Sequence, residues 1–434
     1  MAMTDSAPGR PPSPLRSLPT AECEVFGSEV LLDEETFSWY NPENWYSVRI
    51  GEVFRSRYQV LLKLGFGSVS TVWLCPYIVL TSSSNHQSRR GHRYVTLKVY
   101  ETGHRQAMNE TSVLKYLESI ETSHEGAKLV RLMLDSFEVQ GRKGPHVVIV
   151  HEPLSLSLGD IRGIAGGKLP GNVLKPMILG ILLGLDFLHS VGHVVHTDIQ
   201  EGNIMLAITD QTFFDEVVAS EWASPSARKI DGDRVIYAST GLEIPDDPGF
   251  PIISDFGDAQ FGEMPFIGEV MPDLYRAPEI ILKVPWDEKI DIWALGLMVR
   301  KTCLASTCCR FCSPVADQVQ KIWDLYEGKH LFHKRLPSRE ESSIAHMARM
   351  VSLLGAPPPG LLERSAVAAE IFDDSGMLRG NDGTPNSTLE DEEENLQGDE
   401  KAEFLSFLRK MLQWRPEDRA SAADLMKDPW LRRM

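Results

Sequence analysis

The motifs His196-Thr197-Asp198, Asn203, Asp255-Phe256-Gly257 and Ala277-Pro278-Glu279 follow one another in this order and decide the fold of the chain. Transfer of a phosphoryl group from ATP needs a carboxylate near the acceptor hydroxyl and two further groups that hold Mg²⁺. We expect Asp198 to accept the proton of the hydroxyl, while Asn203 and Asp255 bind the metal. A single short motif arises by chance, but four in order, with Asn203 five positions after Asp198, are specific.

A glycine-rich stretch, residues 64–72, precedes these motifs. Gly65 and Gly67 have no Cβ, so their backbone can lie close over the phosphates of ATP. Ser70 occupies the place of a third glycine, which is a mild departure from the general protein-kinase pattern that the whole set matches. We expect nucleotide contacts from Leu64, Gly65, Gly67, Ser70 and Val72.

An alternating strand over residues 94–100 puts Lys98 at the position of the lysine that binds ATP. This lysine needs a carboxylate partner from the following helix. The best candidate is Glu110, and Glu118 is the alternative. The plainer interpretation of Glu110 is a solvated position on a helix face.

The apolar strand at residues 147–150 leads into a segment that we interpret as the hinge between two lobes. There the carbonyl of Glu152 and the N–H of Leu154 are expected to bond adenine. Pro153 between them has no N–H, but the middle hinge residue does not need one.

These motifs predict an α+β fold of the bilobal protein-kinase type, with a small β-rich N-lobe and a larger α-helical C-lobe. The expected parts are a disordered leader at 1–40, an N-lobe with its N-terminal extension at 41–152, and a C-lobe at 153–434. The aromatic segment 39–46 is expected to pack on the catalytic domain. Within the C-lobe we expect a spacer at about 206–250 and a solvated acidic loop at about 373–400.

Residues 299–321 interrupt what otherwise reads as one buried helix and its end. They hold charged residues and four clustered cysteines, whose burial without partners is costly. We interpret the segment as an insert outside the core, either an exposed excursion or a translated intron, with a shorter one at 76–90. A zinc site is the other interpretation, but adjacent Cys308 and Cys309 suit one tetrahedral site poorly. The clustered cysteines are Cys303, Cys308, Cys309 and Cys312.

The composition, with 42% hydrophobic and 24% charged residues, is that of an ordinary soluble globular protein. A formal net charge of −17 argues against direct nucleic-acid binding and favours a basic partner. We expect no membrane span, because the longest apolar run, residues 176–188, is broken by Asp186. The six cysteines do not resemble a secreted disulfide framework, and residues 1–20 lack an apolar signal core. We therefore expect a monomer of the cytoplasm and nucleus.

From about residue 40 to 430 the chain resembles the SR-protein-specific kinases, especially their fungal relatives. The resemblance is carried by residues 65–74, by Gly184-Leu185-Asp186-Phe187-Leu188-His189 and by the catalytic loop His196-Thr197-Asp198-Ile199. Tyr275-Arg276-Ala277-Pro278-Glu279 and Asp291-Ile292-Trp293 add the signature of a broader kinase group. The resemblance implies a serine/threonine kinase that uses ATP and Mg²⁺ and phosphorylates arginine/serine-rich proteins of mRNA processing.

The catalytic loop departs from the family at Gln200, where a lysine normally neutralises the transferred phosphoryl group. Losing one such preorganised donor is expected to cost about 3–4 kcal/mol of transition-state stabilisation if nothing replaces it. Glu201-Gly202 also replaces the common Pro-Glu.

Thr197, in place of the usual arginine, agrees with the family. Residues 256–274 contain no Ser, Thr or Tyr, so no phosphorylated side chain needs to be gathered there. We expect Arg419 to pair with Glu279 and to support the substrate-binding loop.

Two other function classes remain open at this point. A pseudokinase scaffold, which binds nucleotide or a basic protein without efficient catalysis, is favoured by Gln200. A small-molecule phosphotransferase of the aminoglycoside-kinase kind also carries an HxDxxxxN loop. The peptide-positioning motifs at 275–279 and 291–293 argue against the latter, because a sugar acceptor has no use for them.

Overall fold

The computed structural model describes residues 22–77, 94–165, 169, 171–245, 247–273, 275–298, 339–373, 376–379, 388–393 and 396–433. The proposed insert at 299–321, with its four cysteines, lies outside the described residues, as does most of the excursion expected at 76–90. The chain divides into two compact units, each of which is built from separate stretches of sequence. Unit 1 comprises Met1–Thr111, Leu132–Ser155 and Ile208–Pro248, and unit 2 comprises Ser112–Arg131, Leu156–Ala207 and Gly249–Met434.

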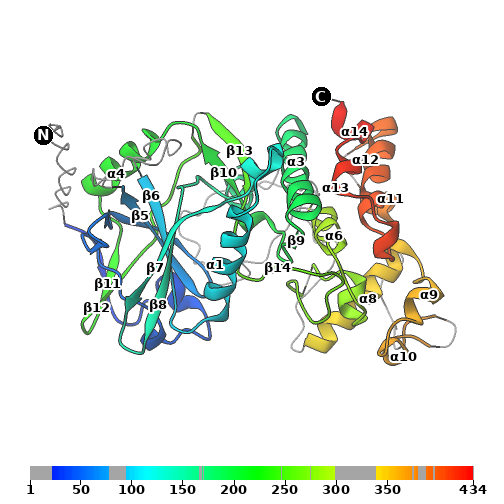
Figure 1. Cartoon of the computed structure of the whole chain (residues 1–434), viewed down its shortest axis with the longest axis horizontal. Coiled ribbons are helices and arrows are strands. Elements are labelled where there is room, and N and C mark those ends of the chain that lie inside the picture. The colour runs from blue at the N-terminus through cyan, green and yellow to red at the C-terminus, as the bar shows by residue number, and fades with distance from the viewer. Residues whose placement is uncertain are drawn as a thin grey trace, which may run out of the picture. The chain divides into compact units, whose positions relative to one another are not determined.

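Unit 1 is built on a five-stranded antiparallel sheet with the strand order β4-β5-β6-β8-β7 (Figure 1). The register sets Gly65 of β4 opposite Val72 of β5, and Val72 opposite Lys98 of β6. Lys98 in turn faces Ile149 of β8. The strands are β4 (Leu62–Phe66), β5 (Ser70–Pro76), β6 (Tyr94–Tyr100), β7 (Met133–Gln140) and β8 (Pro145–His151).

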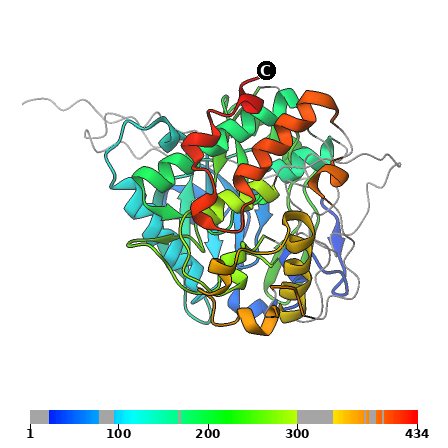
Figure 2. The same cartoon turned by 90° about the vertical axis from the view of Figure 1, so that its right-hand side faces the viewer.

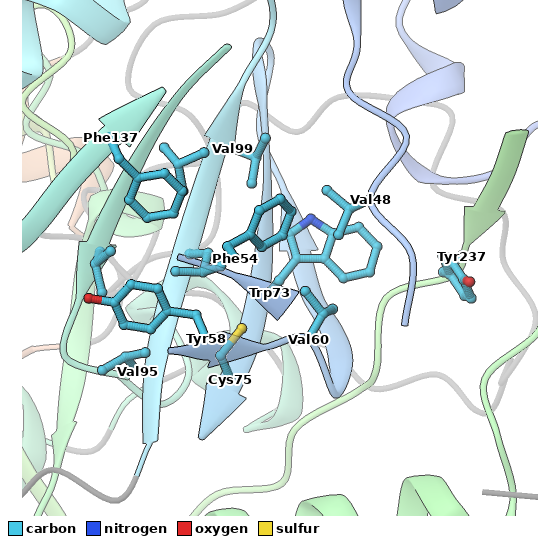
Figure 3. Packing of buried hydrophobic residues seen from close by; sticks show 13 residues of the cluster. Val48, Phe54, Tyr58, Val60, Trp73, Cys75, Val95, Val99, Phe137 and Tyr237 are labelled. Carbon is cyan, nitrogen blue, oxygen red and sulfur yellow. The ribbon is translucent and has the colours of Figure 1, made fainter. Parts of the chain in front are cut away.

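The core of unit 1 lies against this sheet. Every residue of β6 is buried, which means that both faces of the central strand are covered. Alternate side chains of β5 and β6, including Trp73, Cys75 and Val95, pack with Phe54 and Phe137 (Figure 3). Period-two alternation of β-branched and aromatic residues therefore produces the sheet that the sequence predicts.

Residues 22–40 are folded as part of unit 1, although the sequence predicts a disordered leader at 1–40. Strand β1 (Val25–Phe26) pairs in parallel with β11 (Arg228–Asp231), and β11 pairs with β12 (Arg234–Tyr237). Buried charges fix the segment: Lys63 of β4 bonds Glu34 and lies 3.0 Å from Asp33. The expectation of disorder was wrong for these residues because their polar side chains have partners far away in the sequence.

The spacer is also folded, and most of it belongs to unit 1 instead of the C-lobe. Helix α4 (Phe213–Ala223) packs Phe214 and Val218 against β4 and β5 residues. The Tyr94 hydroxyl donates to Asp215 at 2.6 Å. As the sequence predicts, the aromatic segment near Tyr46 packs on this unit, where the Tyr46 ring contacts Phe54.

Unit 2 is mostly helical, and α1 (Arg105–Glu118) runs across the division between the units. Helices α13 and α14 pack on α3, and α12 packs on α14 and α6 (Figure 2). The helices are α2 (Leu158–Ile164), α3 (Gly171–Asp186), α5 (Pro278–Ile281), α6 (Lys289–Leu297), α8 (Arg339–Leu354), α9 (Pro359–Leu362), α10 (Ala368–Ile371), α11 (Leu389–Glu392), α12 (Gly398–Met411), α13 (Ala422–Leu425) and α14 (Pro429–Arg432). The remaining strands are β2 (Val53–Phe54) and β3 (Tyr58–Gln59) of unit 1, and β9 (Val194–Val195), β10 (Ile204–Ile208), β13 (Pro248–Ile253) and β14 (Gln260–Phe261), most of whose residues lie in unit 2.

Helix α3 continues beyond the apolar run seen in the sequence. With its π-helical end it spans Gly171–Val191 and, among the described residues, is the one helix long and apolar enough to cross a membrane. The expectation that no run reaches this length was wrong, because Asp186 does not end the helix. Gly180 and Gly184 let α3 lie close to β13: a Cβ there would come within 2.6 Å of Pro251 and 2.8 Å of Ile253. This close packing is that of a core helix.

The expected acidic loop is partly folded. Residues 388–393 contain α11, and Leu389 and Glu393 are both buried. Glu392 forms an ion pair with Arg349 of α8 at 2.8 Å. These residues therefore belong to the packed part of unit 2, contrary to the solvated loop that their charge predicts.

Candidate active site

The glycine-rich loop, residues 65–70, joins β4 to β5 in unit 1. The Gly67 N–H donates to the Ser70 carbonyl at 2.7 Å and closes the turn. A Cβ built on Gly65 would meet nothing within 4 Å, so the space over this strand is open to a ligand. Ser70 is itself buried, which gives its side chain a place in the core. The loop therefore fits a phosphate cradle formed by backbone, as glycines at these positions allow.

Lys98 pairs with Glu110 of α1, and the distance from Nζ to Oε2 is 2.9 Å. The structure thus confirms the ion pair with Glu110 that the sequence predicts, in preference to Glu118. The Tyr100 hydroxyl donates to the same carboxylate oxygen. Both partners are nearly buried, so the pair holds the ammonium group in a defined position.

The proposed hinge begins where β8 ends, at His151. Because β8 is the neighbour of β6, Glu152 and Leu154 follow directly from the strand beside the lysine strand. Glu152 is exposed and Leu154 is buried. The bonding of adenine by their backbone stays a prediction.

Asp198 lies in the catalytic loop of unit 2 and accepts hydrogen bonds from two side-chain amides. Gln200 Nε2 donates to Oδ1 and to Oδ2 at 2.8 Å each. Asn203 Nδ2 donates to Oδ2 at 2.7 Å and to the Asp198 carbonyl at 2.9 Å. Two neutral donors therefore orient the carboxylate that we expect to receive the proton of the acceptor hydroxyl.

The pKa of the Asp198 carboxyl group is raised toward neutral pH. Burial, helped by the nearby Asp255 and Asp258 carboxylates, raises its pKa from 3.8 to about 7. The hydrogen bonds from Gln200 and Asn203 lower the pKa but do not cancel the effect of burial. A general base works best when its pKa lies near the working pH, so this value suits proton transfer in a kinase.

Asp291 of α6 fixes the backbone of the catalytic loop. Its carboxylate accepts the N–H of His196 at 2.8 Å and the N–H of Thr197 at 2.9 Å. His189 also contacts it, at 3.0 Å. Thr197 has a positive φ of 67°, which costs energy in a non-glycine residue and needs such support. The sequence indicates Asp291 only as part of a group signature and gives no sign of this role.

The two expected metal ligands flank a pair of adjoining strands, because Asn203 directly precedes β10, Asp255 follows β13 by two residues, and β10 pairs with β13. Ser254 donates through its N–H and its hydroxyl to the Asn203 carbonyl, at 2.8 and 3.0 Å. Since the amide nitrogen of Asn203 faces Asp198, its oxygen is left for a cation. Carboxylate and amide oxygens are ligands that Mg²⁺ prefers. Asn203 and Asp255 therefore fit a magnesium site, where the metal would neutralise phosphate charge.

Glu201, which departs from the usual catalytic-loop sequence, forms a bidentate ion pair with Arg162 of α2. The Nε to Oε2 distance is 2.9 Å and the Nη2 to Oε1 distance is 2.7 Å. Glu201 is buried, so the departure is compensated by a partner within unit 2. No local pattern around Arg162 signals this contact in the sequence.

The segment after Asp255 is held by direct contacts within unit 2. The Thr197 hydroxyl donates to the Asp258 carbonyl at 3.0 Å, and β14 pairs with β9. Further along, Phe266 and Trp286 exchange backbone hydrogen bonds. The Trp286 indole donates to the Gly268 carbonyl at 3.0 Å. These bonds order the segment without a phosphate group.

Glu279 and Arg419 form the ion pair that the sequence predicts. Arg419 Nη1 lies 2.6 Å from Oε1, Nη2 lies 2.7 Å from Oε2, and both side chains have no exposed surface. The guanidinium group also covers the ring of Trp293 and donates to the carbonyls of Gln413 and Lys289. The pair thus ties residues 275–279, which we expect to position the peptide, to the last helices of the unit.

Comparisons with known proteins agree with this geometry. The protein kinase domain family matches residues 244–431. A serine/threonine protein kinase of Aspergillus fumigatus is 38% identical over 424 residues, which cover 97% of this chain and 96% of that protein. The serine/threonine-protein kinase SRPK of Physarum polycephalum is 29% identical, covering 94% of this chain and 92% of its own length. A solved kinase domain at 20% identity shares the fold with a TM-score of 0.62, covering 89% of this chain and 99% of its own.

The fold is therefore the bilobal protein-kinase fold, and the chain belongs to the serine/threonine protein kinases. Within that class, the chain is similar to the SRPK of Physarum polycephalum and to the protein kinase dsk1 of Schizosaccharomyces pombe. The family-level resemblance in the sequence is confirmed. The roles of the individual site residues remain predictions.

Proposed function

We propose that this chain is a catalytically active kinase that transfers the γ-phosphoryl group of ATP, with Mg²⁺, to serines in arginine/serine-rich proteins of mRNA processing. The observation that carries the proposal is the arrangement of Asp198, held by Gln200 and Asn203 beside Asp255. A scaffold that only binds nucleotide has no need of a carboxylate oriented on both oxygens.

The chain's own groups have separate tasks in the reaction. Asp198 accepts the proton as the serine oxygen attacks, which requires its ionised form. Lys98, fixed by Glu110, binds phosphate oxygens, and the glycine-rich loop covers them. Asn203 and Asp255 hold magnesium, which neutralises phosphate charge when it is bound. Gln200 keeps Asp198 in place but supplies no positive charge to the transferred group.

The substrate class has two independent supports. The first support is the name of the Physarum relative, SRPK, which agrees with the resemblance of this chain to the SR-protein-specific kinases. The net charge of −17 favours a basic polypeptide over an acidic one. We also propose a monomer that works in the cytoplasm and nucleus and binds its protein substrate directly.

A peptide panel tests the proposal. Purified full-length protein is given radiolabelled ATP and Mg²⁺ with an Arg/Ser repeat, a matched Lys/Ser repeat and an Arg/Ala repeat. The expected result is incorporation into the Arg/Ser peptide, less into Lys/Ser and none into Arg/Ala. Incorporation no greater than that of the Asp198→Asn variant would favour the pseudokinase scaffold, and equal use of both basic peptides would remove the arginine preference.

A further inference from the structure

Trp39 reaches the tip of the glycine-rich loop. Its side chain is 58% exposed, yet its indole N–H donates to the Ser68 carbonyl at 3.2 Å. Both residues belong to unit 1. Because the ring is exposed, its burial contributes little to stability. The main interaction of Trp39 with the loop is therefore this hydrogen bond to Ser68.

Three aromatic rings form a row of contacts that ends at the loop: Trp39 packs on Phe37, and Phe37 packs on Phe66. Phe37 and Trp39 stack, with ring centroids 4.9 Å apart and planes at 16°. Phe37 meets Phe66 edge-on at 5.7 Å and 62°. Such pairs add about 0.5–1.5 kcal/mol each beyond the area that they bury. The loop is therefore contacted at Phe66 and at Ser68 by the same short segment.

The segment that carries these rings is itself fixed at its base. Lys63 has no exposed side-chain surface and bonds Glu34, while its Nζ lies 3.0 Å from Asp33. Glu35 pairs with Lys229 of β11 at 2.7 Å. Buried ion pairs of this kind are costly to break, because one charge would be left without a partner. Residues 33–39 thus connect the start of β4 to the tip of the loop that follows it.

The loop needs such support, because glycine is the residue with the greatest freedom to lose on ordering. Gly65 and Gly67 leave the backbone adaptable, and a side chain on Gly65 would touch nothing. Ordering the loop when ATP binds would cost affinity, and a loop held in advance avoids that cost. We propose that residues 33–39 form an N-terminal brace that holds the glycine-rich loop in place for ATP, with Trp39 as the positioning residue.

This inference rests on the proposed function, because the brace acts through nucleotide binding. Trp39→Phe keeps a ring for Phe37 but removes the N–H, and Trp39→Ala removes both. Losing a hydrogen bond of ordinary strength is expected to raise the KM and Kd for ATP about three- to tenfold. The kcat and the KM for peptide should stay within about twofold of wild type, since the residues on which the chemistry depends are unchanged.

Trp222→Phe is the matched control. Trp222 lies on α4 of the same unit, and its buried indole nitrogen has no hydrogen-bond partner among the residues that the structure describes. This variant should lower the melting temperature while leaving the Kd for ATP unchanged, which separates general destabilisation from loss of the brace. Unchanged ATP affinity in both Trp39 variants would overturn the proposal.

Two readouts keep this test distinct from the proposed function. The Kd is measured by titration with a fluorescent ATP analogue, which needs no turnover. Hydrogen exchange of the amides at residues 66–69 is measured without nucleotide and should be faster in Trp39→Phe than in wild type. If wild type phosphorylates no peptide, the proposed function fails while the brace is still tested. If exchange in the loop is the same in both proteins, the brace is refuted even in an active kinase.

Discussion

The side-chain amide of Gln200 donates to both carboxylate oxygens of Asp198 at 2.8 Å each. The resemblance to the SR-protein-specific kinases implies a lysine at this position, whose positive charge would neutralise the transferred phosphoryl group. Here the neutral amide orients the expected base but supplies no positive charge. The pKa of Asp198, raised to about 7, is consistent with the absence of a counter-charge from Gln200.

Substitution of Gln200 separates the orientation of the base from the positive charge. Gln200→Ala should lower kcat about tenfold, because the carboxylate loses two hydrogen bonds that orient it. Gln200→Lys should raise kcat about tenfold or more, because it returns a charge to the transferred group, and it should lower the pKa of Asp198. Steady-state kinetics of the two variants measure this. A Gln200→Lys enzyme slower than Gln200→Ala would show that the site is built around the amide.

The pH dependence follows from Asp198. Because the base must be ionised, kcat/KM should fall as the pH drops below about 7. Bound Mg²⁺ offsets the charge of Asp255, so higher magnesium should move this limb to lower pH. A pH–rate profile at two magnesium concentrations checks the prediction, and a limb that stays near pH 4 at both would contradict it.

The raised pKa of Asp198 also makes the stability of the fold depend on pH. The direction is opposite to that of a salt-bridged carboxylate, whose pKa is lowered. A raised pKa means that the folded state binds the proton more tightly, so its stabilising contribution is present below about pH 4 and is lost as the pH rises through about 7. Asp198→Asn should therefore raise the melting temperature at pH 8 and have little effect near pH 4. A melting temperature lowered at pH 8 would argue against the burial of the charge.

The activity should not depend on phosphorylation after the Asp255 motif. Residues 256–274 contain no hydroxyl side chain, and Thr197 and Trp286 bond the segment directly. Phosphatase-treated and untreated protein should have equal kcat, measured after the phosphatase has been removed. A large loss on treatment, without a phosphorylated site elsewhere, would contradict this account of how the segment is ordered.

The buried pair of Arg419 and Glu279 should matter far more for stability than an exposed pair. Arg419→Met leaves Glu279 as a buried charge without a partner and should cost about 3–5 kcal/mol of unfolding free energy. The matched control is Arg409→Met, which breaks an exposed pair with Glu390 and should cost less than about 1 kcal/mol. Denaturant unfolding measures both. Equal losses would show that burial is not what makes the first pair important.

The sequence predicted contacts that depend on a motif at a known spacing. Lys98 with Glu110 and Glu279 with Arg419 both form as expected. These pairs could be predicted because each partner belongs to a recognisable strand, helix or motif. The alternation of residues 94–100 likewise predicted the strand that forms β6.

The sequence did not predict contacts between distant residues that share no motif. Nothing local to Glu34 indicates Lys63, and nothing local to Val25 indicates its strand partner Arg228. The leader was therefore expected to be disordered, although long-range pairing folds its residues 22–40. The role of Asp291 was missed for the same reason, since its partners are backbone N–H groups that have no sequence signature.

The most direct test of the central claim compares wild type with Asp255→Asn in transfer of labelled phosphate to an Arg/Ser-repeat peptide. The account predicts steady transfer by wild type that requires magnesium, and a loss of about a hundredfold or more in the variant. Circular dichroism and melting should show that the variant is folded. Transfer by Asp255→Asn at the wild-type rate, or no transfer by either protein, would contradict the claim that these residues form a working phosphoryl-transfer site.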